Sequence, residues 1–99
     1  MEKNTIYLQF DKLITNLSGN RLGVKVYKEQ VAHNIDPEKK NDVIFPEQIE
    51  DIASSFIQGL YSDISENYGK VEALNVMKLT AEKTETQEKI EECIRTYGV

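Results

Sequence analysis

The stretch from Ser54 to Gly69 constrains the fold more than any other part of the sequence. Its large apolar residues recur at intervals of three and four, which is the pattern of one buried face of an α-helix. Gly69 stands where a C-terminal cap belongs. A short apolar segment at residues 42–45, ended by Pro46, predicts a buried strand ahead of this helix. The apolar residues of the helix are Phe56, Ile57, Leu60, Tyr61, Ile64 and Tyr68.

The first forty residues predict one strand and one helix. Residues 5–10 are rich in β-branched and aromatic side chains, which favours a strand. Residues 11–19 form a connector that ends in a turn-forming cluster. Residues 20–35 carry apolar residues at helical spacing, although the alternation of Leu22, Val24 and Val26 leaves a hairpin strand open for the front half. Asp36 precedes a proline, which ends the helix.

The second half of the chain continues the alternation of strands and helices. Residues 47–53 are a turn that crosses the end of the sheet, residues 54–68 are the helix described above, and residues 71–79 predict a third strand. A last helix begins at Thr84, a possible capping residue, and ends before Gly98. Alternating strands and helices predict a single α/β domain over residues 1–99. Its sheet is small and mostly parallel, with three strands, or four if the connector adds one, and three helices serve as right-handed crossovers.

Composition limits the chemistry that this chain can perform. Of its 99 residues, 39% are hydrophobic and 29% are charged, and its formal charge is −5. An acidic protein lacks the basic surface of a dedicated nucleic-acid binder. The sequence contains one cysteine and one histidine, so it predicts neither an internal disulfide nor a zinc cluster. No apolar run approaches the roughly 20 residues that span a bilayer, and Met1-Glu2-Lys3-Asn4 has no apolar signal core. We therefore expect a cytoplasmic protein with no cofactor, no bound metal and no membrane attachment.

Few residues are candidates for catalysis. His33 is the sole imidazole and lies beside the apolar stripe of the first helix, where an ordinary surface histidine is the simpler interpretation. Cys93 lies on the inward face of the last helix, as a small apolar residue would. The carboxylates Glu47, Glu50 and Asp51 follow the central strand, and the sequence leaves open whether they form a solvated turn or a ligand site.

Ser54 and Ser55 lie at the start of the clearest helix. Unpaired backbone N–H groups and the positive end of the helix dipole stabilise a phosphate at such a position by about 0.3 to 1 kcal/mol. Capping of the helix by one of the serines is the simpler alternative.

The segment from Val43 to Phe56 resembles the signature of STAS-like domains, which are relatives of bacterial anti-sigma factor antagonists. In that signature an apolar strand is followed by a spacer and then by Ile-x-x-Ser-Phe at the start of a helix. Ile52, Ser55 and Phe56 occupy the matching places, with Ile49 ahead of them. The resemblance implies a regulatory module without catalytic activity. It also implies that Ser54, or Ser55 beside it, is phosphorylated by a partner with a histidine-kinase-type ATPase fold.

The distribution of charge along the sequence indicates where a partner would dock. Residues 41–72 include seven acidic residues and one basic residue, so a partner that binds the serine-bearing segment should present a basic face. A ligand-binding domain or enzyme that uses the three carboxylates is the alternative, and a subunit that oligomerises through Tyr61 or Tyr97 is a third possibility. The predicted partner-binding residues are Glu47, Glu50, Asp51, Ser54, Ser55 and Gln58.

Overall fold

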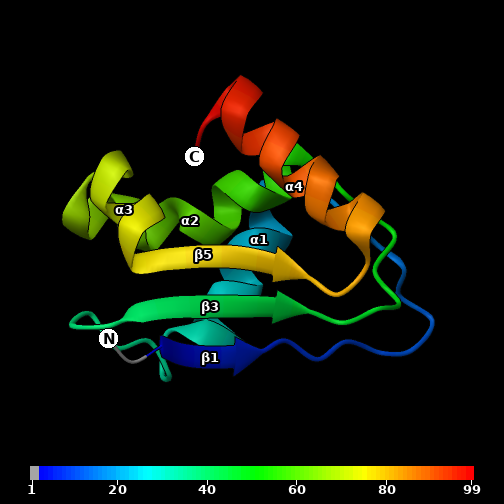
Figure 1. The fold of residues 1–99 in the computed structure, drawn as a ribbon, viewed down its shortest axis with the longest axis horizontal. Helices are drawn as coiled ribbons and strands as arrows, with labels where there is room; N and C mark the ends of the chain where they lie inside the picture. The colour runs from blue at the N-terminus through cyan, green and yellow to red at the C-terminus, as the bar shows by residue number, and fades with distance from the viewer. Residues whose placement is uncertain (1–2) are drawn as a thin grey trace.

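The computed structural model describes residues 3–99, which form an α/β fold around a small parallel sheet (Figure 1). Met1 and Glu2, on which the expectation of no signal segment partly rests, lie outside the described residues. The main sheet has the order β1-β3-β5 and contains β1 (Lys3–Tyr7), β3 (Lys40–Phe45) and β5 (Met77–Ala81). A second, smaller sheet pairs β2 (Asn16–Leu17) with β4 (Asp51–Ile52) in parallel. The helices are α1 (Asn20–Val26), the π-helical segment η1 (Tyr27–Val31), α2 (Ser54–Tyr68), α3 (Lys70–Val76) and α4 (Thr84–Tyr97).

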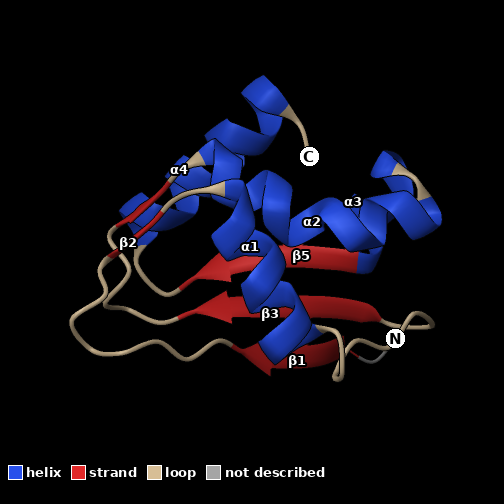
Figure 2. Cartoon of the chain, turned by 180° about the vertical axis from the view of Figure 1, so that it is seen from behind, coloured by secondary structure: helices blue, strands red, loops and turns tan. Residues whose placement is uncertain are grey.

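The main sheet has one covered face and one open face. Side chains alternate between the two faces of a strand, and Val43, Phe45 and Leu79 on the covered face are buried. Figure 2 shows α1 and α2 lying across that face. The opposite face is turned to the viewer in Figure 1, and no helix of the described chain lies in front of it. Tyr7 on this open face is 66% exposed.

Helix α2 lies at the centre of the core. Its apolar stripe, predicted from the sequence, is buried through Phe56, Ile57, Leu60, Tyr61 and Ile64. The ring of Phe56 meets that of Phe45 edge to face at 6.2 Å. Burying apolar area of this kind is the dominant stabilising contribution to a fold. The buried apolar residues of sheet and helices form one continuous cluster.

Two glycines bring α1 and α2 into close contact. A Cβ atom added at Gly23 would come within 2.2 Å of the Phe56 carbonyl oxygen, and one added at Gly59 would come within 2.1 Å of the Asn20 carbonyl oxygen. Only a residue without a side chain fits at either position. The close contact fixes the start of α2 against α1.

Helix α4 and α2 protect the outer edge of β5. Gln87 Oε1 accepts a hydrogen bond from the Ala81 N–H at 2.6 Å, and the Tyr61 hydroxyl donates to the Met77 carbonyl oxygen at 2.6 Å. Unpaired strand edges invite association with other strands. The side chains of two helices therefore satisfy backbone groups that a further strand would otherwise pair with.

The predicted fold class is confirmed: the chain has a small, parallel, three-stranded sheet and helices between the strands. The described chain contains four α-helices instead of the three predicted, because the segment predicted as one strand is divided. Residues 70–76 are α3, and the strand begins only at Met77. Glu72, Ala73 and Leu74 are good helix formers, and burial of Ala73 and Val76, three residues apart, anchors one face of that helix.

Other boundaries differ by a few residues. The first strand covers residues 3–7 instead of 5–10, although the Leu8 N–H still pairs with the Ile44 carbonyl oxygen. The first helix and η1 end at Val31, and the alternative of a hairpin strand there is wrong. The connector does add a strand, β2, but this strand pairs with β4 in the predicted turn and does not join the main sheet.

Candidate docking surface at the start of helix α2

Backbone hydrogen bonds to the connector hold the segment that leads into α2. The Glu50 N–H donates to the Thr15 carbonyl oxygen at 2.8 Å, and the Ala53 N–H donates to that of Leu17 at 2.9 Å. The Gln48 side-chain amide donates to the carbonyl oxygens of Asp11 and Ile14. These hydrogen bonds join residues 11–17 to residues 48–53. The start of α2 therefore has a fixed position beyond the carboxyl end of β3.

The two serines have different surroundings, although they are neighbours in sequence. Ser55 Oγ accepts a hydrogen bond from the Gly19 backbone N–H at 3.0 Å, so its hydroxyl joins the start of α2 to the start of α1. Ser54 is half-buried, and within the described chain its hydroxyl makes no hydrogen bond to protein. Neither serine caps the helix, because Ala53 occupies the N-cap position. Ser54 therefore presents a hydroxyl that the fold does not use.

The acidic turn is partly neutralised by Lys89 of α4 and by Lys83, which directly precedes that helix. Lys83 Nζ lies 3.5 Å from a Glu50 carboxylate oxygen, and Lys89 Nζ lies 2.9 Å from an Asp51 carboxylate oxygen. Glu50, Asp51 and Lys89 are exposed and Lys83 is half-buried, so each pair contributes no more than about 1 kcal/mol. Glu47 is exposed as well. The surface is therefore a mixture of carboxylates and lysines.

Gln58 extends the surface along α2. It lies four residues after Ser54 and therefore on the same side of the helix. It is half-buried and lines a shallow groove of about 550 Å³ together with Ser62, Ser65, Glu66, Lys70 and Val99. The structure thus brings Ser54, Ser55 and Gln58 onto one helix, and Glu50 and Asp51 directly precede them. Glu47 lies further back, in the turn that follows β3.

Sequence reasoning missed Lys83, Lys89 and the amide of Gly19. Lys83 and Lys89 lie 33 and 38 residues after their partners, and Gly19 lies 36 residues before Ser55. No local pattern encodes such pairs. Residues 83–89 show no excess of positive charge that could have pointed to these lysines, because the same segment contains Glu85 and Glu88.

The remaining reactive side chains lie outside this surface. His33 is exposed, in the turn after η1. Cys93 is half-buried against the Ile52 carbonyl oxygen, and burial raises the pKa of its thiol, with smaller contributions in the same direction from Glu92 and Asp51. A raised pKa lowers the thiolate fraction on which cysteine reactivity depends. Within residues 3–99, no group of three or more His, Cys, Asp or Glu side chains is arranged to hold a metal ion.

Comparisons with known proteins give no further identification. No family model matches the chain, and neither the curated proteins nor the solved structures yield a match. Among residues 3–99, no helix combines the length and apolar character needed to cross a bilayer.

Proposed function

We propose that this chain is a small regulatory protein-binding module, similar to STAS-like domains, that binds its partner through the start of α2. Its docking surface consists of Ser54, Ser55 and Gln58 together with the acidic turn of Glu47, Glu50 and Asp51. The expected partner is a protein with a histidine-kinase-type ATPase fold, and the expected setting is the cytoplasm. The proposal rests on the sequence resemblance and on one structural observation: Ser54 is half-buried and its hydroxyl makes no hydrogen bond within the described chain.

Phosphorylation of Ser54 is the proposed switch. A phosphate adds nearly two negative charges and a tightly bound water shell at the centre of the docking surface. The free N–H groups of the first helical turn stabilise this charge in the unbound protein. A partner would have to remove the water on docking, and Glu50 and Asp51 would repel the phosphate. Phosphorylation should therefore weaken the complex without unfolding the protein.

Ser55 is the less suitable acceptor of the two. Its hydroxyl is half-buried and holds the Gly19 N–H. A kinase would have to break this hydrogen bond before it could transfer a phosphate there. We therefore assign the switch to Ser54 and a structural role to Ser55.

The alternative of a ligand-binding domain or enzyme that uses Glu47, Glu50 and Asp51 stays a prediction. No observation favours it over the docking surface, because the three carboxylates are exposed and two of them pair with Lys83 and Lys89.

Affinity capture from the native host, followed by reconstitution, tests the proposal. The captured protein is purified and its affinity for the full chain is measured by calorimetry, with Ser54→Asp, Ser54→Ala and, as a control on the exposed side of α4, Thr96→Asp. We expect Ser54→Asp to weaken binding about tenfold or more, which corresponds to about 1.4 kcal/mol, while the other two variants bind as the wild type does.

Incubation of the same pair with ATP and phosphosite mapping by mass spectrometry completes the test. The expected result is phosphate on Ser54 and release of the complex. Unchanged affinity of Ser54→Asp, or phosphate confined to other residues, would refute the switch.

A further inference from the structure

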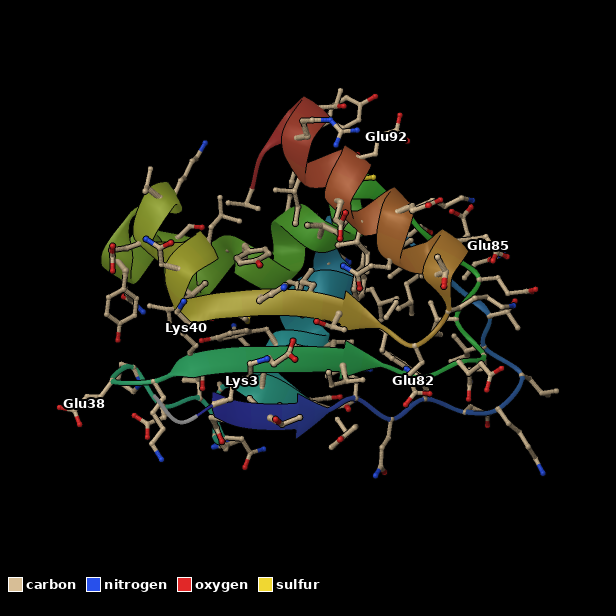
Figure 3. All side chains as sticks on the ribbon, in the orientation of Figure 1. Lys3, Glu38, Lys40, Glu82, Glu85 and Glu92 are labelled. Carbon is tan, nitrogen blue, oxygen red and sulfur yellow. The ribbon has the colours of Figure 1, made fainter. Side chains whose placement is uncertain are left out.

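Three lysines gather at the amino end of the main sheet. Lys3 is the first residue of β1, Lys40 is the first residue of β3, and Lys78 lies at the start of β5. Lys3 and Lys40 are direct partners in the parallel register, and Lys78 is the partner of Asp42. Residues directly opposite each other in adjacent strands point to the same face. Figure 3 shows Lys3 and Lys40 at this end of the sheet, on its open face, with Glu82 and Glu85 near the opposite end.

Within the described chain, none of these three lysines forms an ion pair. The ion pairs found within residues 3–99 use Lys39, Lys83 and Lys89. Asp42, the carboxylate nearest in register, accepts a hydrogen bond from Thr80 Oγ1 at 2.6 Å. Like charges directly opposite each other in a sheet are destabilising. A protein with a formal charge of −5 therefore keeps three lysines at one end of its sheet, where Asp42 compensates only part of their charge.

The cluster surrounds a concave site. Lys3, Lys40 and Lys78 line a cleft of about 330 Å³, and its other walls are Asn41, Asp42, Leu74 and Asn75. A cleft of this size lies at the lower end of the range for small-molecule sites. Three lysines and one aspartate leave a formal charge of +2. Leu74, which is 39% exposed, adds an apolar side to an otherwise polar site.

We propose that this cleft binds a small phosphate monoester. A phosphate monoester carries a charge of about −1.5 to −2 at pH 7 and has three strong acceptor oxygens, which matches the charge of the cleft. Each lysine ammonium group offers three donors and can turn toward the phosphate. The organic part of the ligand would lie against Leu74 and the Asn75 amide. Binding would remove the repulsion between Lys3 and Lys40, so ligand and fold would stabilise each other.

This site is independent of the proposed docking surface. It lies where the strands begin, whereas α2 starts beyond the end at which β3 finishes with Phe45. Loss of one activity therefore need not affect the other, and the two can be tested separately.

A titration followed by amide NMR tests the site. Glucose 6-phosphate and inorganic phosphate are added separately to the full-length protein, with glucose and sulfate as controls. We expect saturable shifts of the amide signals around Lys3, Lys40 and Lys78 with glucose 6-phosphate, weaker binding of inorganic phosphate, and no response to glucose. Absence of saturation by about 10 mM, a concentration that still detects weak ligands, would overturn the proposal. Equal affinity for sulfate or for inorganic phosphate would overturn the assignment to an ester.

A matched pair of double variants separates the cleft from general charge effects. Lys40→Gln with Lys78→Gln removes two charges from the cleft, and Lys25→Gln with Lys28→Gln removes two from the exposed face of α1 and η1. The first variant should lose about tenfold or more in affinity for glucose 6-phosphate, and the second should bind nearly as the wild type does. Equal losses in both would contradict the site. Thermal unfolding without ligand provides the folding control, because removing the lysine repulsion should leave the melting temperature unchanged or raised.

Discussion

Ser54 and Ser55 differ in what their hydroxyls do for the folded state, and this difference can be measured. Ser55→Ala leaves the Gly19 N–H without its partner, which should lower the free energy of unfolding by about 1 kcal/mol. Ser54→Ala removes no hydrogen bond and should change it by less than about 0.5 kcal/mol. Urea unfolding followed by circular dichroism measures both. Equal losses in the two variants would show that the hydroxyls are equivalent and would remove the reason for assigning the switch to Ser54.

Tyr61 couples stability to alkaline pH. Burial raises the pKa of its phenol well above the ordinary value near 10, and the hydroxyl donates to the Met77 carbonyl oxygen. A raised pKa in the folded state means that the stabilisation is complete below the pKa of the unfolded chain, at about 10, and is lost as the pH rises beyond it. Tyr27 acts in the same direction, because burial, followed by Asp63 and Tyr68, raises its pKa as well.

Tyr61→Phe tests this coupling. At pH 7 the variant leaves a buried carbonyl oxygen unpaired and should be about 1 to 3 kcal/mol less stable than the wild type. Above pH 10 its free energy of unfolding should fall less steeply, with Tyr27 accounting for part of the remaining slope. Urea unfolding at several pH values between 7 and 11 gives both slopes. Parallel pH profiles for the two proteins would show that Tyr61 is not the titrating group.

At the scale of elements, the contact between α1 and α2 depends on Gly23 and Gly59. In an exposed helix, replacing glycine by alanine would stabilise the protein by about 1 kcal/mol. Here the added methyl group would meet backbone oxygen atoms at 2.1 to 2.2 Å, and overpacking against backbone costs about 1 to 3 kcal/mol or more. We therefore expect Gly23→Ala and Gly59→Ala to destabilise the protein by about 2 kcal/mol or more.

Chemical denaturation provides the measurement, and Lys25→Ala on the exposed side of α1 provides the control. The control should change the free energy of unfolding very little, because Lys25 is exposed and surface substitutions have small effects on stability. A stabilising effect of Gly23→Ala would show that the two helices can separate at little cost, and the fixed position of α2 would then need another explanation.

Local sequence patterns predicted the elements whose burial is periodic. The apolar stripe of α2 and the short run of β3 each agree with the structure because their spacing matches the buried face. The prediction of one strand at residues 71–79 is wrong because the apolar spacing changes within this segment. Apolar residues occur on both sides of Met77, but those before it are spaced for a helix and those after it for a strand. The break in alternation at Met77, visible in the sequence, marks the junction between the two.

The candidate site was predictable in position and not in detail. A strand, a turn and an amphipathic helix place Ser54 and Ser55 at a helix start without any tertiary information. The hydrogen bond from Gly19 and the ion pair between Asp51 and Lys89 join segments more than thirty residues apart. Such contacts depend on how the helices pack, so a single sequence does not encode them locally. The choice between the two serines therefore required the structure.

At the scale of the whole molecule, the buried side chain of Asn41 joins segments from the two halves of the chain. Its Oδ1 accepts hydrogen bonds from the Asn4 side-chain amide and the Asp36 N–H, at 2.8 and 2.9 Å. Its Nδ2 donates to the carbonyl oxygens of Asp36, Lys39 and Val76. Asn41 is 1% exposed. One amide thus connects β1, the loop before β3, and the end of α3.

Replacing Asn41 should therefore have a global effect. Asn41→Ala leaves several buried or half-buried backbone groups unpaired and removes packing, so we expect a loss of about 3 kcal/mol in the free energy of unfolding. Asn41→Asp keeps the shape, but it removes the donor and buries a charge, and the loss should be at least as large. A domain of this size has a free energy of unfolding of about 5 to 15 kcal/mol. Either variant would therefore remove a large share of it.

Asn75→Ala is the matched control. Asn75 lies on the exposed side of α3 and donates one long hydrogen bond to Glu72, at 3.3 Å, so its loss should cost less than about 0.5 kcal/mol. Hydrogen exchange distinguishes a global effect from a local one. In Asn41→Ala, protection should fall together in β1, β3 and β5, since the amide links the strand starts to α3. If protection falls only in residues 34–41, Asn41 fixes a loop and does not hold the sheet together.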